Sequence, residues 1–174
     1  NPIIKIVEPV LAIGFILHIL YGIYTWFGNF TARPVKYQRV NQSKASTWAS
    51  RNMIILGALI VIFLGLHLMN FWWKIKFAGD PALAPVMVGG VEMENAYALV
   101  AGLFKASLVY DLLYIAGAVF LGLHLTHGFW SAFQTIGWSN DIWRKRIEVV
   151  ATVYAYVIAI GFSIIPLYFI LKFN

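Results

Sequence analysis

Long apolar stretches separated by shorter polar ones dominate the pattern of the chain. Four of the stretches are long enough to cross a bilayer, since a spanning helix needs about 20 mostly apolar residues. They cover about residues 3–27, 53–73, 107–133 and 147–171. Each begins or ends in aromatic residues, which is typical of helix ends at a membrane interface. The pattern predicts an all-α transmembrane helical bundle, with four spanning helices in a single domain over residues 1–174.

The composition supports lipid as the surroundings of these helices. Hydrophobic residues make up 61% of the 174 residues and charged residues only 11%, against about 25% charged in soluble domains. The chain has no cysteine, which excludes disulfides and iron–sulfur ligation by this chain.

The net charge of +6 is explained by topology rather than by a nucleic-acid partner. The basic residues lie between the apolar stretches, as the positive-inside rule requires of cytoplasmic loops. Loops 28–52 and 144–146 are the basic ones, so we expect them to be cytoplasmic and Asn1 to be outside. Loop 74–106 is then external, and we expect residues 92–104 within it to form a short interfacial helix.

All of the histidines fall within the predicted spans: His18, His67, His124 and His127. An ionisable side chain in a span is costly, so it is a candidate functional residue by default. The alternative is a histidine hydrogen-bonded across a helix interface. The placement of all four histidines within spans favours a ligand that they share. A repeated hexapeptide centred on histidine, Phe63–Leu68 and Phe120–Leu125, points the same way.

Haem b suits these histidines best, because neutral imidazole is a standard axial ligand of haem iron. Zinc and copper sites usually add cysteine or carboxylate ligands, and none lies at matching depth. Glycines near the histidines would let a flat macrocycle approach the backbone, although they also favour close helix packing. These glycines are Gly14, Gly65, Gly117, Gly122 and Gly128.

Helix rise predicts which histidines share a level. His18 lies about 22 Å along its helix from Ile3, and His124 about 25 Å from Ser107, at 1.5 Å per residue. Both helices run inward, so the two histidines reach the same inner level and are predicted to hold one haem as an axial pair.

The other two histidines do not complete a second pair. His67 lies about 21 Å from Met53 on an outward-running helix, hence on an outer level. His127 is one turn further inward than His124, and we expect it to donate a hydrogen bond to a haem propionate or to another helix. His67 is either structural or has its partner on a helix upstream of Asn1. We expect the second, because the chain does not begin with Met.

Three segments resemble a known family: residues 1–24 (NPIIKIVEPVLAIGFILHILYGIY), 46–53 (STWASRNM) and 122–137 (GLHLTHGFWSAFQTIG). They are similar to the di-haem cytochrome b membrane anchor of bacterial succinate:quinone oxidoreductases, the succinate dehydrogenase/fumarate reductase family (complex II), and closest to the Bacteroidetes-type subunit. The resemblance covers essentially the whole chain. Its most specific element is the His-x-x-x-Gly-x-Trp pattern at His124, Gly128 and Trp130.

The resemblance implies five spanning helices in the complete subunit and two haems b. His18 and His124 would hold the inner haem, and His67 the outer one with a histidine upstream of Asn1. The implied partners are a flavoprotein subunit with FAD, an iron–sulfur subunit, and menaquinone or another quinone, in the bacterial cytoplasmic (inner) membrane. The basic stretches 33–51 and 144–146 would face the iron–sulfur subunit, or would serve topology alone.

Two carboxylates are candidates for the proton uptake that accompanies quinone reduction. Glu8 lies in the first span toward the outer face, and Asp111 is a second candidate near the same face. Glu8 also suits a helix start, with Pro9 in the first turn. Arg51, at the cytoplasmic end of the second span, would pair with a propionate or only follow the positive-inside rule. The expected cofactor-binding residues are His127, Arg51, Gly14, Gly65, Gly128 and Trp130.

Two other functions fit less of the sequence. A cytochrome b subunit of another quinone-linked complex, such as a hydrogenase or formate dehydrogenase, would use the same histidines. A transporter with a histidine proton relay needs polar residues along its path, whereas these spans are almost purely apolar. The sequence therefore favours the anchor subunit of succinate dehydrogenase/fumarate reductase, which carries quinone chemistry but no dicarboxylate site.

Overall fold

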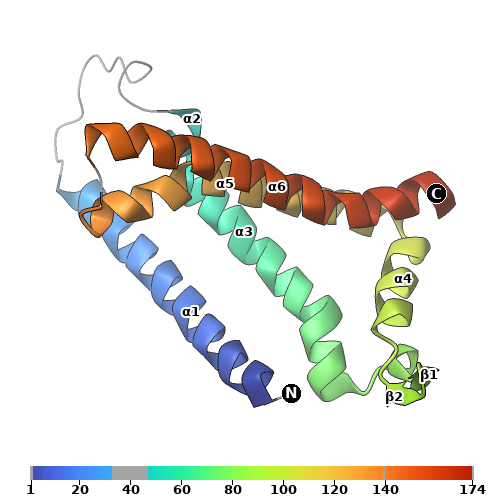
Figure 1. The fold of residues 1–174 in the computed structure, drawn as a ribbon. Helices are drawn as coiled ribbons and strands as arrows, with labels where there is room; N and C mark the ends of the chain where they lie inside the picture. The colour runs from blue at the N-terminus through green and yellow to red at the C-terminus, as the bar shows by residue number, and fades with distance from the viewer. Residues whose placement is uncertain (1, 33–46, 139, 174) are drawn as a thin grey trace. The chain divides into compact units, whose positions relative to one another are not determined.

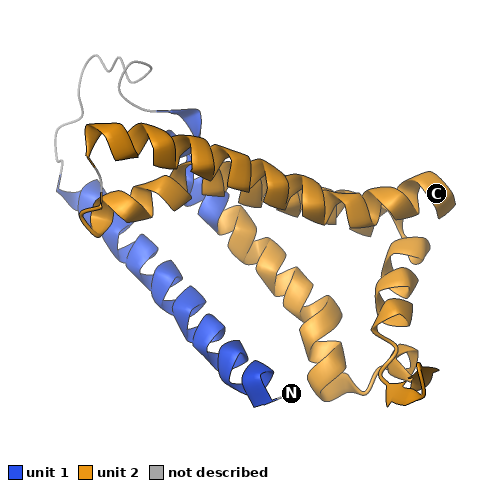
Figure 2. Cartoon of the chain, in the orientation of Figure 1, with its two compact units in different colours: residues 1–57 blue, residues 58–174 orange. Residues whose placement is uncertain are grey.

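The computed structural model describes residues 2–32, 47–138 and 140–173. They form two compact units, residues 1–57 and 58–174, which are considered separately (Figure 2). The basic residues between 33 and 46, expected to contact a partner subunit, lie outside the described residues.

Unit 1 contains one long helix and the start of a second. Helix α1 (Pro2–Thr31) is longer than the predicted span and includes Pro9 in its interior. The short helix α2 (Trp48–Arg51) is capped by Thr47, whose side chain accepts a hydrogen bond from Ser50 N at 3.2 Å. Helix α3 (Met53–His67) follows, and the boundary between the units falls within it.

In unit 2, α3 continues as a widened helix. Two π-helical segments, η2 (Leu68–Trp72) and η3 (Lys74–Ala78), extend it to Gly79, where a positive φ of 57° ends it. Glycine adopts this conformation at no steric cost, which suits it to stop a helix. π-Helical turns are rare and frequently occur at functional sites. Here they begin at the residue after His67.

Helices α5 (Leu108–Thr135) and α6 (Asp141–Phe173) run side by side (Figure 1). Small residues line their contact. A Cβ added at Gly122 of α5 would lie 2.7 Å from Ala159 Cβ of α6, and Ala151 and Ala155 of α6 are almost completely buried. Small residues four apart allow helix backbones to approach closely, as is typical of helix pairs in membranes.

The segment between the second and third spans corrects one prediction. The expected helix over residues 92–104 begins only at Ala96, because strands β1 (Val86–Val88) and β2 (Val91–Met93) form an antiparallel hairpin before it. Gly89 and Gly90 supply φ values of 59° and 83°, as a two-residue hairpin turn requires. Strand β2 therefore takes the place of the first residues of the expected helix.

The same connection is fixed at both ends by side-chain caps. Asp80 accepts a hydrogen bond from Ala82 N at 2.9 Å, at the start of the 3-10 turn η4 (Pro81–Leu83). Its carboxylate also pairs with Lys74 at 3.2 Å. These contacts hold the pKa of Asp80 below its usual value, the hydrogen bond from Ala82 N being the largest cause. Asn95 caps the next helix, α4 (Ala96–Ala106), in the same way.

The predicted fold class is confirmed. Within the described residues, four helices are long and apolar enough to cross a membrane: Pro2–Thr31, Met53–Ala78, Leu108–Thr135 and Asp141–Phe173. A helix pairs most of its backbone groups internally, as a hydrocarbon environment requires. Most of their apolar side chains remain exposed, which suits contact with lipid. The chain is a multi-pass all-α membrane protein.

Candidate functional site

The four histidines all lie on the spanning helices. His18 is exposed on α1 in unit 1. His67 is the last residue of α3, and His124 and His127 lie half-buried on α5, all in unit 2. The pairing of His18 with His124 joins two separately described units, so it stays a prediction.

His67 lies at the edge of an aromatic cluster centred on Tyr114 of α5. The His67 ring is 6.1 Å from the Tyr114 ring, 5.3 Å from Phe71 and 6.2 Å from Phe63. Phe104 of α4 meets Tyr114 edge to face at 5.1 Å. Edge-to-face contact is a favourable arrangement of two aromatic rings. His67 is therefore held on one side by aromatic rings, while its other side remains exposed.

A hydrogen bond ties the widened part of the second span to the same cluster. Asn70, in the π-helical segment η2, donates from Nδ2 to the Tyr114 hydroxyl at 3.2 Å. Tyr114 is buried, and a buried phenol requires a polar partner. Tyr114 and Asn70 were not predicted as site residues. The only signal in the sequence was an aromatic residue four positions before and after His67.

The cluster also defines the levels of two histidines within unit 2. His67 packs beside Tyr114, and His124 lies ten residues further along α5, which is about 15 Å at 1.5 Å per residue. His67 and His124 are therefore too far apart along α5 to ligate one iron together. This spacing supports assigning them to different levels.

At the other end of α5, His127 contacts the start of α6 through Trp130. The His127 and Trp130 rings meet edge to face at 5.0 Å, and the Arg144 guanidinium lies 5.3 Å from the centre of the Trp130 ring. His127 Nδ1 is buried and has no hydrogen-bond partner among the described residues. A buried ring nitrogen of this kind is costly, and it fits the predicted hydrogen bond to a polar group of a bound cofactor.

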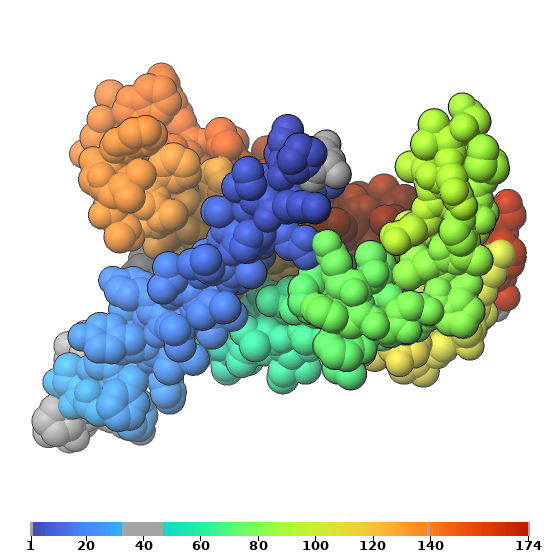
Figure 3. All heavy atoms as spheres, turned by 90° about the horizontal axis from the view of Figure 1, so that it is seen from below, coloured from blue at the N-terminus to red at the C-terminus, as the bar shows by residue number. Residues whose placement is uncertain are grey.

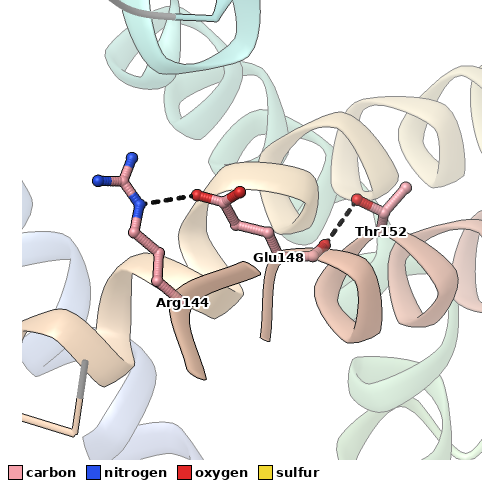
Figure 4. A network of polar contacts seen from close by, with 3 residues as sticks. All are labelled: Arg144, Glu148 and Thr152. Atoms are coloured by element: carbon pink, nitrogen blue, oxygen red, sulfur yellow. Dashed lines mark hydrogen bonds and ion pairs between the residues drawn. The ribbon is translucent and has the colours of Figure 1, made fainter. Parts of the chain in front are cut away.

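Arg144, which was expected to face a partner subunit, also makes contacts within the chain. Its Nε donates to Glu148 Oε1 at 2.9 Å, and the Glu148 carbonyl accepts from Thr152 Oγ1 at 2.8 Å (Figure 4). An exposed pair one helical turn apart stabilises a helix by only about 0.3–0.5 kcal/mol. The bond to Glu148 still holds the Arg144 side chain while its guanidinium lies over the Trp130 ring.

The glycines divide into two groups. Gly14 and Gly65 have open space beside them, as the approach of a flat macrocycle would require. At Gly117, an added Cβ would lie 2.5 Å from the Phe63 ring, and at Gly122 it would meet α6. Gly117 and Gly122 therefore follow the second of the two alternatives, close helix packing. Gly128 directly follows His127 on α5.

The charged candidates differ in their surroundings. Asp111, in the first turn of α5, is completely buried at 0% exposure, whereas Glu8 of α1 is half-buried. Because α1 already begins at Pro2, the alternative placing of Glu8 and Pro9 at a helix start is wrong. Arg51 is exposed and ends α2, two residues before α3 begins.

Within residues 2–32, 47–138 and 140–173, no group of three or more His, Cys, Asp or Glu residues could hold a metal ion. Ligation of haem iron requires only two side chains, which can be far apart in the sequence, so this finding concerns metal sites built from three or more residues. In comparisons with family models, with curated proteins and with solved structures, nothing matches this chain.

Proposed function

We propose that this chain is the cytochrome b membrane anchor of a succinate:quinone oxidoreductase. In this role it carries electrons between an iron–sulfur subunit and quinone through haem b. The observation that supports it most is the placement of all four histidines on membrane-spanning helices, at more than one level. The family resemblance of the residues around His124 is the reason for proposing this particular complex.

In this proposal His18 and His124 would hold the inner haem. His67 would be one of the residues that hold the outer haem. Haem, when bound, supplies one-electron transfer, and its potential depends on the polarity around the ligands. Phe63, Phe71 and Tyr114 line one side of His67 with aromatic rings.

The quinone step also needs protons, which a protein carboxylate can supply or accept. Asp111 and Glu8 remain the two proposed groups. Asp111 is completely buried in the first turn of α5, three residues before Tyr114. A buried carboxylate within a span is a candidate for proton transfer. The proposed partners are the iron–sulfur subunit and a flavoprotein subunit with FAD, in a bacterial cytoplasmic membrane, with menaquinone or another quinone as the substrate.

The decisive experiment is a reduced-minus-oxidised absorption spectrum of the purified full chain. We expect the α-band of b-type haem, and its absence would refute the proposed function. The paired variants His124→Ala and His127→Ala then test the assignment of ligands, since they remove equal side chains one helical turn apart. We expect His124→Ala to lose the inner haem and His127→Ala to retain it. Equal loss in both variants contradicts the assignment without contradicting the function.

A further inference from the structure

The β1–β2 hairpin carries an apolar face that the protein leaves exposed. Side chains of directly paired residues lie on the same side of a sheet, and the pairs are Val86 with Met93 and Val88 with Val91. Four apolar side chains therefore share one face. Three of them, Val88, Val91 and Met93, are 57%, 61% and 53% exposed.

The opposite face has a different character. Alternate residues of a strand point to opposite sides, so Met87 and Glu92, which pair with each other, form the second face. Both are exposed, and one of them is charged. The hairpin is thus amphipathic, although each strand has only three residues.

A two-stranded hairpin is at best marginally stable in water. An apolar face of Val88, Val91 and Met93 that stayed in water would add nothing to its stability, because hydrophobic stabilisation requires removing apolar area from water. A covering environment would stabilise both the face and the pairing of the strands.

The position of the hairpin in unit 2 indicates what this environment is. The hairpin begins eight residues after the second span ends at Ala78, and α4 begins three residues after it. Helix α4 packs against η2, α5 and α6, so both ends of the hairpin are tied to the ends of spanning helices. Figure 3 shows it as a yellow-green projection beside them.

Residues typical of a membrane interface lie near the ends of the spans on this side of unit 2. Trp72 and Trp73 lie near the end of the second span, as interfacial aromatic residues do. The last span ends in two contacts between a lysine and an aromatic ring. Lys105 of α4 lies 4.3 Å from the centre of the Phe173 ring, and Lys172 lies 5.4 Å from the centre of the Tyr168 ring. Lysines near a span end place their charged groups at the membrane interface while their stems cover apolar surface.

We propose that the face formed by Val86, Val88, Val91 and Met93 inserts into the boundary between lipid headgroups and acyl chains. The apolar surface of the spans is then continuous with that of the hairpin, which lies on the membrane as an interfacial anchor. The opposite face, with Glu92, remains in water. Amphipathic segments bind at this depth by burying one apolar face. This inference does not depend on whether the chain binds haem.

The absence of cysteine from the chain makes a direct test possible. Single variants Val91→Cys and Glu92→Cys place a thiol on each face at adjacent positions, so each is the control of the other. The full chain is placed in nanodiscs of phosphatidylethanolamine and phosphatidylglycerol, where both membrane surfaces are accessible. We expect a water-soluble maleimide to label Val91→Cys about tenfold more slowly than Glu92→Cys, the ratio given by a preference of about 1.4 kcal/mol.

A second measurement identifies what covers the slow position. A fluorophore attached at Val91→Cys should be quenched by lipids that carry a nitroxide just below the headgroup, and a fluorophore at Glu92→Cys should not. Equal labelling rates of the two variants would overturn the proposal. Slow labelling of Val91→Cys without quenching by the lipid would overturn it too, because a second protein surface would then cover the face.

Discussion

Gly122 is the position where one added carbon atom should matter most. In Gly122→Ala, the new Cβ would lie 2.7 Å from Ala159 Cβ and 3.3 Å from the Ala155 carbonyl oxygen. Carbon atoms pack best at about 3.5–4.0 Å, so α5 and α6 must separate by about 1 Å. Overpacking of this kind costs about 1–3 kcal/mol.

Alanine is also the better helix former, by about 1 kcal/mol over glycine, so a matched control is needed. Gly161→Ala provides it, since Gly161 lies on α6 with open space around it. Both variants gain the same propensity, and only Gly122→Ala meets a neighbour. We expect Gly122→Ala to be less stable than Gly161→Ala by about 1–3 kcal/mol.

The assay is unfolding of the purified full chain by sodium dodecyl sulfate in mixed micelles, followed by far-ultraviolet circular dichroism. The double variant Gly122→Ala/Ala159→Gly removes the Ala159 Cβ that the new methyl group would meet. Its stability should therefore exceed the sum of the two single effects by at least about 1 kcal/mol. Effects that add within about 0.5 kcal/mol, or a Gly122→Ala as stable as Gly161→Ala, would refute the close approach of the helices.

Three further predictions concern unit 2. Tyr114→Phe removes the acceptor of the 3.2 Å hydrogen bond from Asn70 and should lower the stability in the same assay by about 0.5–1.5 kcal/mol; an unchanged midpoint would show that the bond contributes nothing. The turn that Asp80 caps should be fully formed above the usual carboxyl pKa of about 3.9, and should loosen as the pH falls through the lowered folded-state pKa. The protection factor of the Ala82 amide, which is its hydrogen-exchange rate relative to the intrinsic rate at each pH, should report this, and Asp80→Asn should remove the pH dependence of that factor; a dependence that persists in Asp80→Asn would contradict it. Gly90→Ala places a side chain at a φ of 83° and should cost about 1–2 kcal/mol locally, measured as faster hydrogen exchange in β1 and β2; unchanged exchange would contradict the strain.

The spans could be predicted from the sequence because their length is set by the bilayer. A helix that crosses about 30 Å of hydrocarbon must be apolar throughout, and such stretches are visible without any tertiary information. The different levels of His67 and His124 follow equally directly, because the rise per residue of a helix is constant. The helix ends were less predictable, and the Gly89-Gly90 hairpin was missed.

The partners of each side chain were decided only by the tertiary structure. In a membrane, the helix faces toward lipid and toward other helices are both apolar, so the sequence does not show which face packs. From the sequence, Gly65 and Gly122 are equally plausible as sites of close helix packing. In the structure Gly65 has open space beside it, whereas a Cβ at Gly122 would meet Ala159. The packing of Tyr114 against His67, and the hydrogen bond from Asn70, join residues more than forty positions apart. Contacts of this kind depend on how α3, α4 and α5 pack, which local periodicity does not encode.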